Sequence, residues 1–106
     1  MKRGEIWTFR DNRYASKARP VIIVQSDHVR DFDSVILCLF TTYKSVHIPT
    51  RILIPPTHDN SLEKTSYVMT EKIITVAINE LGEKIGELTD AQMVEISTQL
   101  ALVLGL

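Results

Sequence analysis

The sequence predicts one small domain that is mainly β, with a C-terminal α-helix packed on a curved sheet or an open barrel. Two observations carry this prediction. Short apolar runs, interrupted by proline and polar turn residues, fill the first three quarters of the chain, and a helix-capping pattern opens the last quarter. With 106 residues, 44% of them hydrophobic, the chain forms a single core and a single domain, residues 1–106. Several strands followed by one long helix are typical of a sheet that the helix covers.

The strands are predicted from the period and the continuity of the apolar runs. Alternation of polar and apolar residues indicates a half-buried strand at the start of the chain, whereas the continuous runs indicate strands covered on both faces. The prolines after the fourth run end it, because proline cannot continue the hydrogen-bonded ladder. The predicted strands are residues 5–9, 20–24, 34–42, 50–54 and 66–76, the last of which supplies one or two strands.

The helix is predicted from the end of the chain. Thr89 and Gln92 match a capping box, in which each side chain accepts a hydrogen bond from the backbone of the other residue. Gly82 is predicted to be a turn and Gly86 a strand boundary. The apolar tail, residues 100–106, has more hydrophobic surface than one sheet-facing stripe needs, which predicts that a second subunit covers part of it. The residues expected on the sheet-facing side of the helix are Met93, Ile96, Leu100 and Val103.

Several functional classes are excluded by composition. No run approaches the roughly 18 apolar residues of a membrane span, and the N-terminus lacks the apolar segment of a secretory signal. Cys38 lies in an apolar run, which predicts a buried thiol in a reducing, cytoplasmic compartment. His28, His47 and His58 lie in three different predicted loops without ligand spacing, so we expect neither a metal nor a cofactor. His28 stays a candidate general base, because imidazole titrates near neutral pH.

Charge is distributed unevenly along a chain whose net charge is only −1. Residues 1–19 carry six cations against Glu5 and Asp11, whereas residues 80–106 carry five acids against Lys84 alone. A basic end of this kind suits a polyanionic partner, and it also suits a protein with a neutral, dipolar surface. The asymmetry by itself leaves both interpretations open.

A phosphate-binding pair is predicted where two central strands begin and end. Arg19 opens one apolar strand and Thr41 closes the next, so the two residues share a rim of the sheet if the strands are antiparallel neighbours. A planar guanidinium and a small hydroxyl together suit a phosphate group. The alternative is structural: Arg19 covers the sheet edge and Thr41 is only a β-former.

The loop before Arg19 is expected to hang over this rim. It carries the cations Arg10, Arg13 and Lys17, and Tyr14 is placed to stack on an unpaired base. The nearby Trp7 and Phe9 are expected in the core, from their positions along the first strand.

Residues 3–7 (Arg-Gly-Glu-Ile-Trp) and 19–21 (Arg-Pro-Val), with the order of apolar runs around them, resemble the MazF/PemK family of toxin endoribonucleases over nearly the whole chain. The resemblance implies an SH3-like β-barrel of the CcdB/PemK-like type with a terminal helix, and a homodimer. It also implies cleavage of single-stranded RNA without a metal, and an antitoxin whose acidic, initially disordered segment occupies the RNA groove.

The resemblance assigns residues as well. Arg19 matches the catalytic arginine that opens a strand in the family, and Thr41 matches the catalytic threonine or serine that ends one. The implied reaction is attack of a ribose 2′-hydroxyl on phosphorus, which leaves a 2′,3′-cyclic phosphate and a 5′-hydroxyl. Glu71 matches an acidic position of some members, and Lys72 supplies a cation where Ile74 replaces a family arginine. The loop at residues 11–18 is shorter than in typical members and lacks their usual Glu or His, so no general base is evident.

Two other functions share this fold. Residues 13–27 also resemble CcdB, the gyrase-poisoning relative, whose activity depends on a C-terminal Trp-Gly-Ile. Here the chain ends Leu104-Gly105-Leu106, and loss of the tryptophan removes an aromatic anchor. The third possibility is a non-catalytic binding module. The match of Arg19 and Thr41 ranks the nuclease first.

Overall fold

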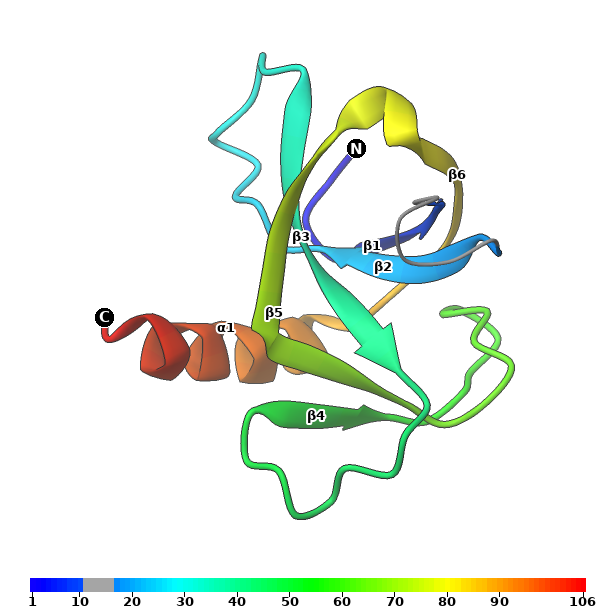
Figure 1. Cartoon of the computed structure of the whole chain (residues 1–106), viewed down its shortest axis with the longest axis vertical. Helices are drawn as coiled ribbons and strands as arrows, with labels where there is room; N and C mark the ends of the chain where they lie inside the picture. The colour runs from blue at the N-terminus through cyan, green and yellow to red at the C-terminus, as the bar shows by residue number, and fades with distance from the viewer. Residues whose placement is uncertain (11–16) are drawn as a thin grey trace.

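The structure is a computed structural model that describes residues 1–10 and 17–106 (Figure 1). Its described strands form one antiparallel sheet in the order β4-β5-β3-β2-β1-β6. The predicted class, mainly β with one C-terminal helix, is confirmed. The elements are β1 (Glu5–Phe9), β2 (Arg19–Ile23), β3 (Ser34–Thr41), β4 (Arg51–Ile54), β5 (Ser66–Ala77), a 3₁₀ turn (Ile78–Glu80), β6 (Leu81–Glu87) and α1 (Asp90–Leu104).

The sheet curves because β5 bends in its middle. Cys38 of β3 pairs with Ile73 of β5, whereas the next residue, Leu39, pairs with Met69, so residues 70–72 have no partner in β3. An insertion of this kind bends the strand that carries it. Figure 1 shows the bend as a corner beside α1. The segment predicted to hold one or two strands is therefore one bent strand, whose first half pairs with β4 and whose second half pairs with the start of β3.

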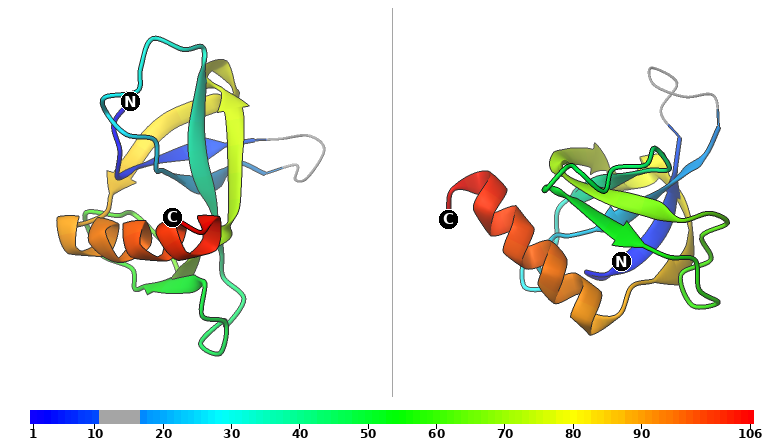
Figure 2. Two further views of the ribbon diagram at one scale, coloured as in Figure 1. Left: turned by 90° about the vertical axis from the view of Figure 1, so that its left-hand side faces the viewer. Right: turned by 90° about the horizontal axis from the view of Figure 1, so that it is seen from below.

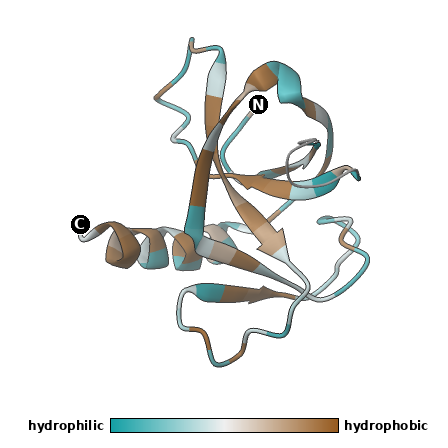
Figure 3. Cartoon of the chain, in the orientation of Figure 1, coloured by the Kyte–Doolittle hydropathy of each residue, from teal (hydrophilic) through white to brown (hydrophobic). Residues whose placement is uncertain are grey.

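Two cores lie on the two faces of the sheet, which explains the continuous apolar runs. Ile22 and Cys38 point into a core shared with Met93 and Ile96 of α1, while their strand neighbours point into a second core on the other face. Figure 3 shows hydrophobic colour along the central strands and along the C-terminal part of α1. The buried residues of the second core are Phe9, Val21, Ile23, Val35, Leu37, Val76 and Leu81.

Strand β6 was not predicted. Gly82, predicted to be a turn, and Gly86, predicted to be a boundary, both lie within it, and the strand pairs with β1 through Trp7↔Lys84 and Phe9↔Leu81. The prediction was wrong because Leu81 is the only buried residue of β6. An edge strand that buries one side chain shows neither alternation nor an apolar run.

The segment between β4 and β5 bridges the two edge strands, β4 and β6, which do not pair with each other in the described residues. Asn60 is buried, and its side-chain oxygen accepts hydrogen bonds from the backbone N–H groups of Thr57 and Leu62, both at 3.0 Å. The backbone N–H of Glu87 in β6 donates to the carbonyl of Asp59 at 3.0 Å. A side chain at Gly86 would lie 2.6 Å from that carbonyl oxygen, so this contact requires glycine.

The helix begins as predicted and ends at a left-handed glycine. The Thr89 hydroxyl accepts from the Gln92 N–H at 3.1 Å, the Gln92 side chain accepts from the Thr89 N–H at 2.9 Å, and Gly105 adopts the left-handed conformation with φ 72°. Met93 and Ile96 are buried, whereas Val103 is more exposed than expected, at 37%. Figure 2 shows why: the C-terminal end of α1 extends beyond the sheet. No helix in the described ranges is long and apolar enough to span a membrane.

Candidate active site

The candidate site lies where β2 begins and β3 ends. Val21 pairs with Leu39 and Ile23 with Leu37, and this pairing ends two residues short of Arg19 and Thr41, which by alternation lie on the same faces of their strands as Val21 and Leu39. Directly opposed side chains of antiparallel strands lie on the same face of the sheet. The predicted pair thus shares the face of the second core, at its rim. The expectation that these strands are antiparallel neighbours is confirmed.

The same face continues across β5 and β4. Thr41 pairs with Tyr67, and the neighbouring row joins Leu39, Met69 of β5 and Arg51 of β4. Arg51 therefore lies on the face that carries Thr41, one row further in. Sequence reasoning assigned no site role to Arg51, although it is the first residue of an apolar strand, as Arg19 is.

The hydroxyl of Thr41 is held from one side. Its oxygen accepts a hydrogen bond from the backbone N–H of Tyr43 at 3.1 Å. A hydroxyl that accepts in this way still has its proton to donate to another group. Arg19 is exposed at the start of β2, so its guanidinium meets solvent rather than the core. A phosphate oxygen can accept hydrogen bonds from both the guanidinium of Arg19 and the hydroxyl of Thr41.

Further cations flank the rim. Arg10 follows β1 directly and Lys17 lies two residues before β2; both are exposed. Because Phe9 pairs with Arg19, these cations lie at the same end of the sheet as Arg19. The predicted contacts Arg13 and Tyr14 lie outside the described residues.

The aromatic residues near this end belong to the interior, as expected. Phe9 is 6% exposed in the second core, and Trp7 packs against the same core while half-buried. The indole N–H of Trp7 donates to Glu5 at 3.0 Å, so its polar atom has a protein partner. Neither ring is presented to solvent as a stacking surface.

Glu71 and Lys72 lie in the bulge of β5, and their surroundings differ. Lys72 is exposed. Glu71 accepts from Arg51, with Nε at 3.0 Å and Nη2 at 2.8 Å from Oε2, and from the Thr50 hydroxyl at 2.8 Å on Oε1. Burial opposes ionisation of Glu71, but hydrogen bonds from Arg51, its own backbone and Thr50 outweigh burial and lower its pKa from the ordinary 4.5. Both carboxylate oxygens already have protein partners.

One other residue was missed by sequence reasoning. Nη1 of Arg51 donates to the hydroxyl of Ser45 at 3.2 Å, and that hydroxyl donates to the carbonyl of Tyr43 at 2.7 Å. Ser45 is fully buried although it lies in a polar connection between strands. The signal for Arg51 was a cation at the mouth of an apolar strand, but nothing in the sequence singles out Ser45.

Other kinds of site find little support. The described residues contain no group of three or more His, Cys, Asp or Glu side chains that could hold a metal ion. His28, His47 and His58 are exposed. Cys38 is fully buried as predicted, and burial raises the pKa of its thiol to about 12. It is therefore not a nucleophile at neutral pH.

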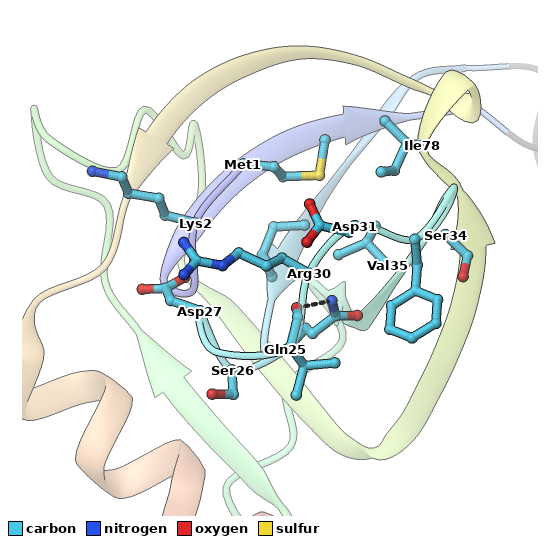
Figure 4. A pocket seen from close by; sticks show the side chains of 13 residues that line it. Met1, Lys2, Gln25, Ser26, Asp27, Arg30, Asp31, Ser34, Val35 and Ile78 are labelled. Atoms are coloured by element: carbon cyan, nitrogen blue, oxygen red, sulfur yellow. Dashed lines mark hydrogen bonds between the residues drawn. The ribbon is translucent and has the colours of Figure 1, made fainter.

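A cavity of about 430 Å³ lies at the other end of β2, away from Arg19 (Figure 4). The N-terminal residues and the β2–β3 connection line it, with Lys2, Asp27 and Arg30 among the charged groups. The Gln25 amide donates to the carbonyl of Val29 at 2.6 Å and helps to shape this connection. The cavity includes none of the predicted site residues, so Arg19 and Thr41 belong to a separate surface.

One family model and two curated relatives match most or all of this chain. A family model described as "PemK-like, MazF-like toxin of type II toxin-antitoxin system" matches residues 2–104. The "Probable endoribonuclease MazF" of Mycolicibacterium smegmatis is 35% identical over 107 residues, which cover 100% of this chain and 98% of the relative. The "Endoribonuclease MazF" of Staphylococcus saprophyticus is 31% identical over 90 residues, which cover 83% of this chain and 74% of the relative.

Solved structures give the same result. A mycobacterial endoribonuclease in complex with its cognate antitoxin superposes with a TM-score of 0.83 at 32% identity, covering 100% of this chain and 96% of that one. A MazE–MazF structure from Deinococcus radiodurans, at 13% identity, a TM-score of 0.81 and coverage of 100% and 96%, shows the shared fold alone. The chain therefore belongs to the family of PemK-like, MazF-like toxins of type II toxin–antitoxin systems.

Proposed function

We propose that this chain cleaves single-stranded RNA by attack of a ribose 2′-hydroxyl on the adjacent phosphorus, without a metal ion. By its family and its relatives the chain is an endoribonuclease toxin, and the proposal concerns its chemistry. The observation that supports it is the pairing of β2 with β3, which puts Arg19 and Thr41 on one face of the sheet at neighbouring strand ends. A guanidinium and a hydroxyl on one face can both donate hydrogen bonds to the oxygens of a single phosphodiester.

In the proposed reaction the 2′-oxygen forms a bond to phosphorus and the bond to the 5′-oxygen breaks. The products are a 2′,3′-cyclic phosphate and a 5′-hydroxyl. Arg19 stabilises the negative charge that develops on the phosphorane and donates a proton to the leaving 5′-oxygen, while the proton of the 2′-hydroxyl is released to water, which returns one to Arg19, so that no net proton is lost. Thr41 donates its hydroxyl proton to a phosphate oxygen and so aligns the phosphorus with its attacker. DNA is not a substrate, because it lacks the nucleophile.

The substrate strand follows the cations around this pair. Arg10 and Lys17 flank Arg19, and Lys72 lies exposed in the β5 bulge, so all three are available to neighbouring phosphates. The segment that holds Arg13 and Tyr14 is proposed to complete the contact, with the tyrosine ring stacking on a base. Glu71 was also predicted to contact RNA, although Arg51 and Thr50 engage its oxygens.

Three further proposals follow from family membership. A cognate antitoxin binds this chain, as one binds the mycobacterial relative. A second copy of the chain covers the exposed apolar end of α1, where Leu102 is 69% and Leu106 is 91% exposed. The cytoplasm is the compartment in which a toxin that cleaves cellular RNA meets its substrate.

The test is an assay on single-stranded RNA in the presence of excess chelator, with analysis of the product ends. We expect 2′,3′-cyclic phosphate and 5′-hydroxyl ends from the wild-type protein. Arg19→Ala should lower the rate at least about 100-fold, the scale on which loss of one transition-state donor acts. Its thermal unfolding should hardly change, because the side chain is exposed.

Arg30→Ala is the matched control, since it removes an exposed cation from the connection at the opposite end of β2. It should cleave like the wild type. Cleavage that stops in chelator, or an Arg19→Ala protein that retains full activity, contradicts the proposed chemistry. A large fall in melting temperature for Arg19→Ala supports the structural role instead.

A further inference from the structure

A chain of hydrogen bonds connects the β5 bulge to the hydroxyl of Thr41. Glu71 pairs with Arg51 at 2.8 Å, and the far nitrogen of the same guanidinium, Nη1, donates to Ser45 at 3.2 Å. Ser45 donates to the Tyr43 carbonyl at 2.7 Å, and the Tyr43 N–H donates to Thr41 at 3.1 Å. Arg51 lies on the sheet face that carries Thr41, and Tyr43 and Ser45 lie in the connection from β3 to β4 that follows Thr41.

The direction of each bond in the series is fixed. Arg51 can only donate, so the Ser45 oxygen must accept, and the Ser45 proton is then directed to the carbonyl of Tyr43. The Tyr43 N–H can also only donate, so the oxygen of Thr41 accepts from it. The proton of Thr41 is left to point elsewhere, and in the proposed reaction it meets the phosphate.

The series also holds the backbone next to Thr41. The carbonyl and the N–H of Tyr43 belong to the two peptide groups that flank its Cα, and each is held by a side-chain oxygen. Ser45 is fully buried and the side chain of Arg51 is 17% exposed, so water competes little for the two bonds of Ser45, whereas the bond from the Tyr43 N–H to Thr41 is exposed. The exposed tyrosine ring, 66% accessible, therefore extends from a backbone that its neighbours hold in place.

We propose that Ser45, Arg51 and Glu71 are positioning residues that orient the hydroxyl of Thr41 toward the scissile phosphate. This assigns to Glu71 a role inside the protein instead of a contact with RNA. The inference rests on the proposed function, because it requires Thr41 to act on the substrate. It predicts that the three residues affect turnover through Thr41 and leave RNA binding alone.

Ser45→Ala removes the two hydrogen bonds that connect Arg51 to Tyr43, and it leaves the Arg51–Glu71 pair in place. We expect kcat to fall roughly five- to thirtyfold, the range that one or two kcal/mol produces. KM, and the affinity for a non-cleavable 2′-deoxy analogue, should stay within about twofold of wild type. A fall in kcat with an unchanged KM is expected when a contact made only in the transition state is lost.

Ser97→Ala is the matched control. The Ser97 hydroxyl accepts from Arg3 and donates to the carbonyl of Met93 at 2.8 Å, so it makes the same two kinds of bond as Ser45, but on α1. Ser97 is exposed whereas Ser45 is fully buried, so Ser97→Ala controls for the loss of a hydroxyl that bridges an arginine and a carbonyl. We expect Ser97→Ala to leave kcat unchanged, and melting temperatures report any loss of stability in either variant.

A double-mutant cycle with Thr41→Val separates the inference from the proposed function. In the Thr41→Val background, Ser45→Ala should cost no further kcat, because the group that it orients is gone. Arg51→Lys, which keeps the pair with Glu71 but loses the fork that reaches Ser45, should lower kcat like Ser45→Ala and add nothing to it.

The outcomes are distinct. An equal loss of kcat for Ser45→Ala in both backgrounds, a change in RNA affinity, or no change at all overturns the positioning role while Thr41 stays in the site. Unchanged turnover in Thr41→Val alone overturns the assignment of Thr41, and with it the proposed mechanism.

Discussion

Two arginines occupy equivalent places in the sequence and very different places in the fold. Arg19 and Arg51 are each the first residue of an apolar strand. The side chain of Arg51 is 17% exposed and is paired with Glu71, because a guanidinium withdrawn from water needs a counter-charge. Arg19 is exposed and needs none to be stable. Its charge is therefore available to an incoming anion, whereas the charge of Arg51 is used within the protein.

Cys38 allows a prediction at the scale of one residue. With its pKa raised to about 12 by burial, the thiol is almost entirely protonated at pH 8, and no reagent reaches it in the folded protein. We expect a thiol-reactive dye to label the native protein negligibly over minutes and to label one thiol per chain at once in denaturant. Fast labelling of the native protein would mean that the β2–β3 pair opens readily.

At the scale of elements, the β5 bulge does two things together. It turns the strand so that one half pairs with β4 and the other half with the start of β3, and it moves Glu71 out of the regular ladder. There Glu71 meets Thr50 and Arg51, at the start of the neighbouring strand. Curvature of the sheet and the position of this ion pair thus have the same cause, the unpaired residues 70–72.

The Arg51–Glu71 pair predicts how stability depends on pH. The pKa of Glu71 is lower in the folded protein than its ordinary 4.5, so below 4.5 the unfolded chain binds a proton that the native state does not. The stabilising contribution is present above 4.5 and is lost as the pH falls through the folded pKa. Between pH 7 and pH 3, the melting temperature of Glu71→Gln should therefore fall less than that of the wild type.

Glu63→Gln is the control for this experiment, because Glu63 is an exposed glutamate in the loop before β5. It should follow the wild-type dependence on pH. The same acid dependence in Glu71→Gln and in the wild type would show that the ion pair contributes little to the stability of the fold.

At the scale of the whole molecule, the predictable parts were those that leave a periodic or a chemical signal. The capping box of α1 and the continuous central strands follow from local sequence, whereas the site at Arg19 and Thr41 stays a prediction. Strand β6 could not be predicted from local sequence, since it lies at the edge of the sheet and buries only Leu81. Neither could Ser45, because its role depends on a side chain from another strand, which no local pattern reports.

The apolar end of α1 gives a prediction about assembly. Val94 and Leu102 are 67% and 69% exposed, and they lie on one helical side because they are eight residues apart. Leu102→Glu should convert a homodimer to a monomer, since it introduces a charge into the apolar contact. Light scattering at micromolar concentration measures the mass. Ile78→Glu, an equivalent change at an exposed site in the 3₁₀ turn, should leave the dimer intact, and a wild-type monomer would contradict the prediction.

The connection built on Asn60 has a consequence for solubility. A sheet that does not close has two open edges, and an unpaired edge invites strands of other molecules to add to it, as in amyloid. Here the carbonyl of Asp59 takes up the N–H of Glu87, and the backbone of residues 59–60 lies tightly against Gly86. This contact obstructs the β6 edge against strand addition and so favours a protein that stays dispersed in solution.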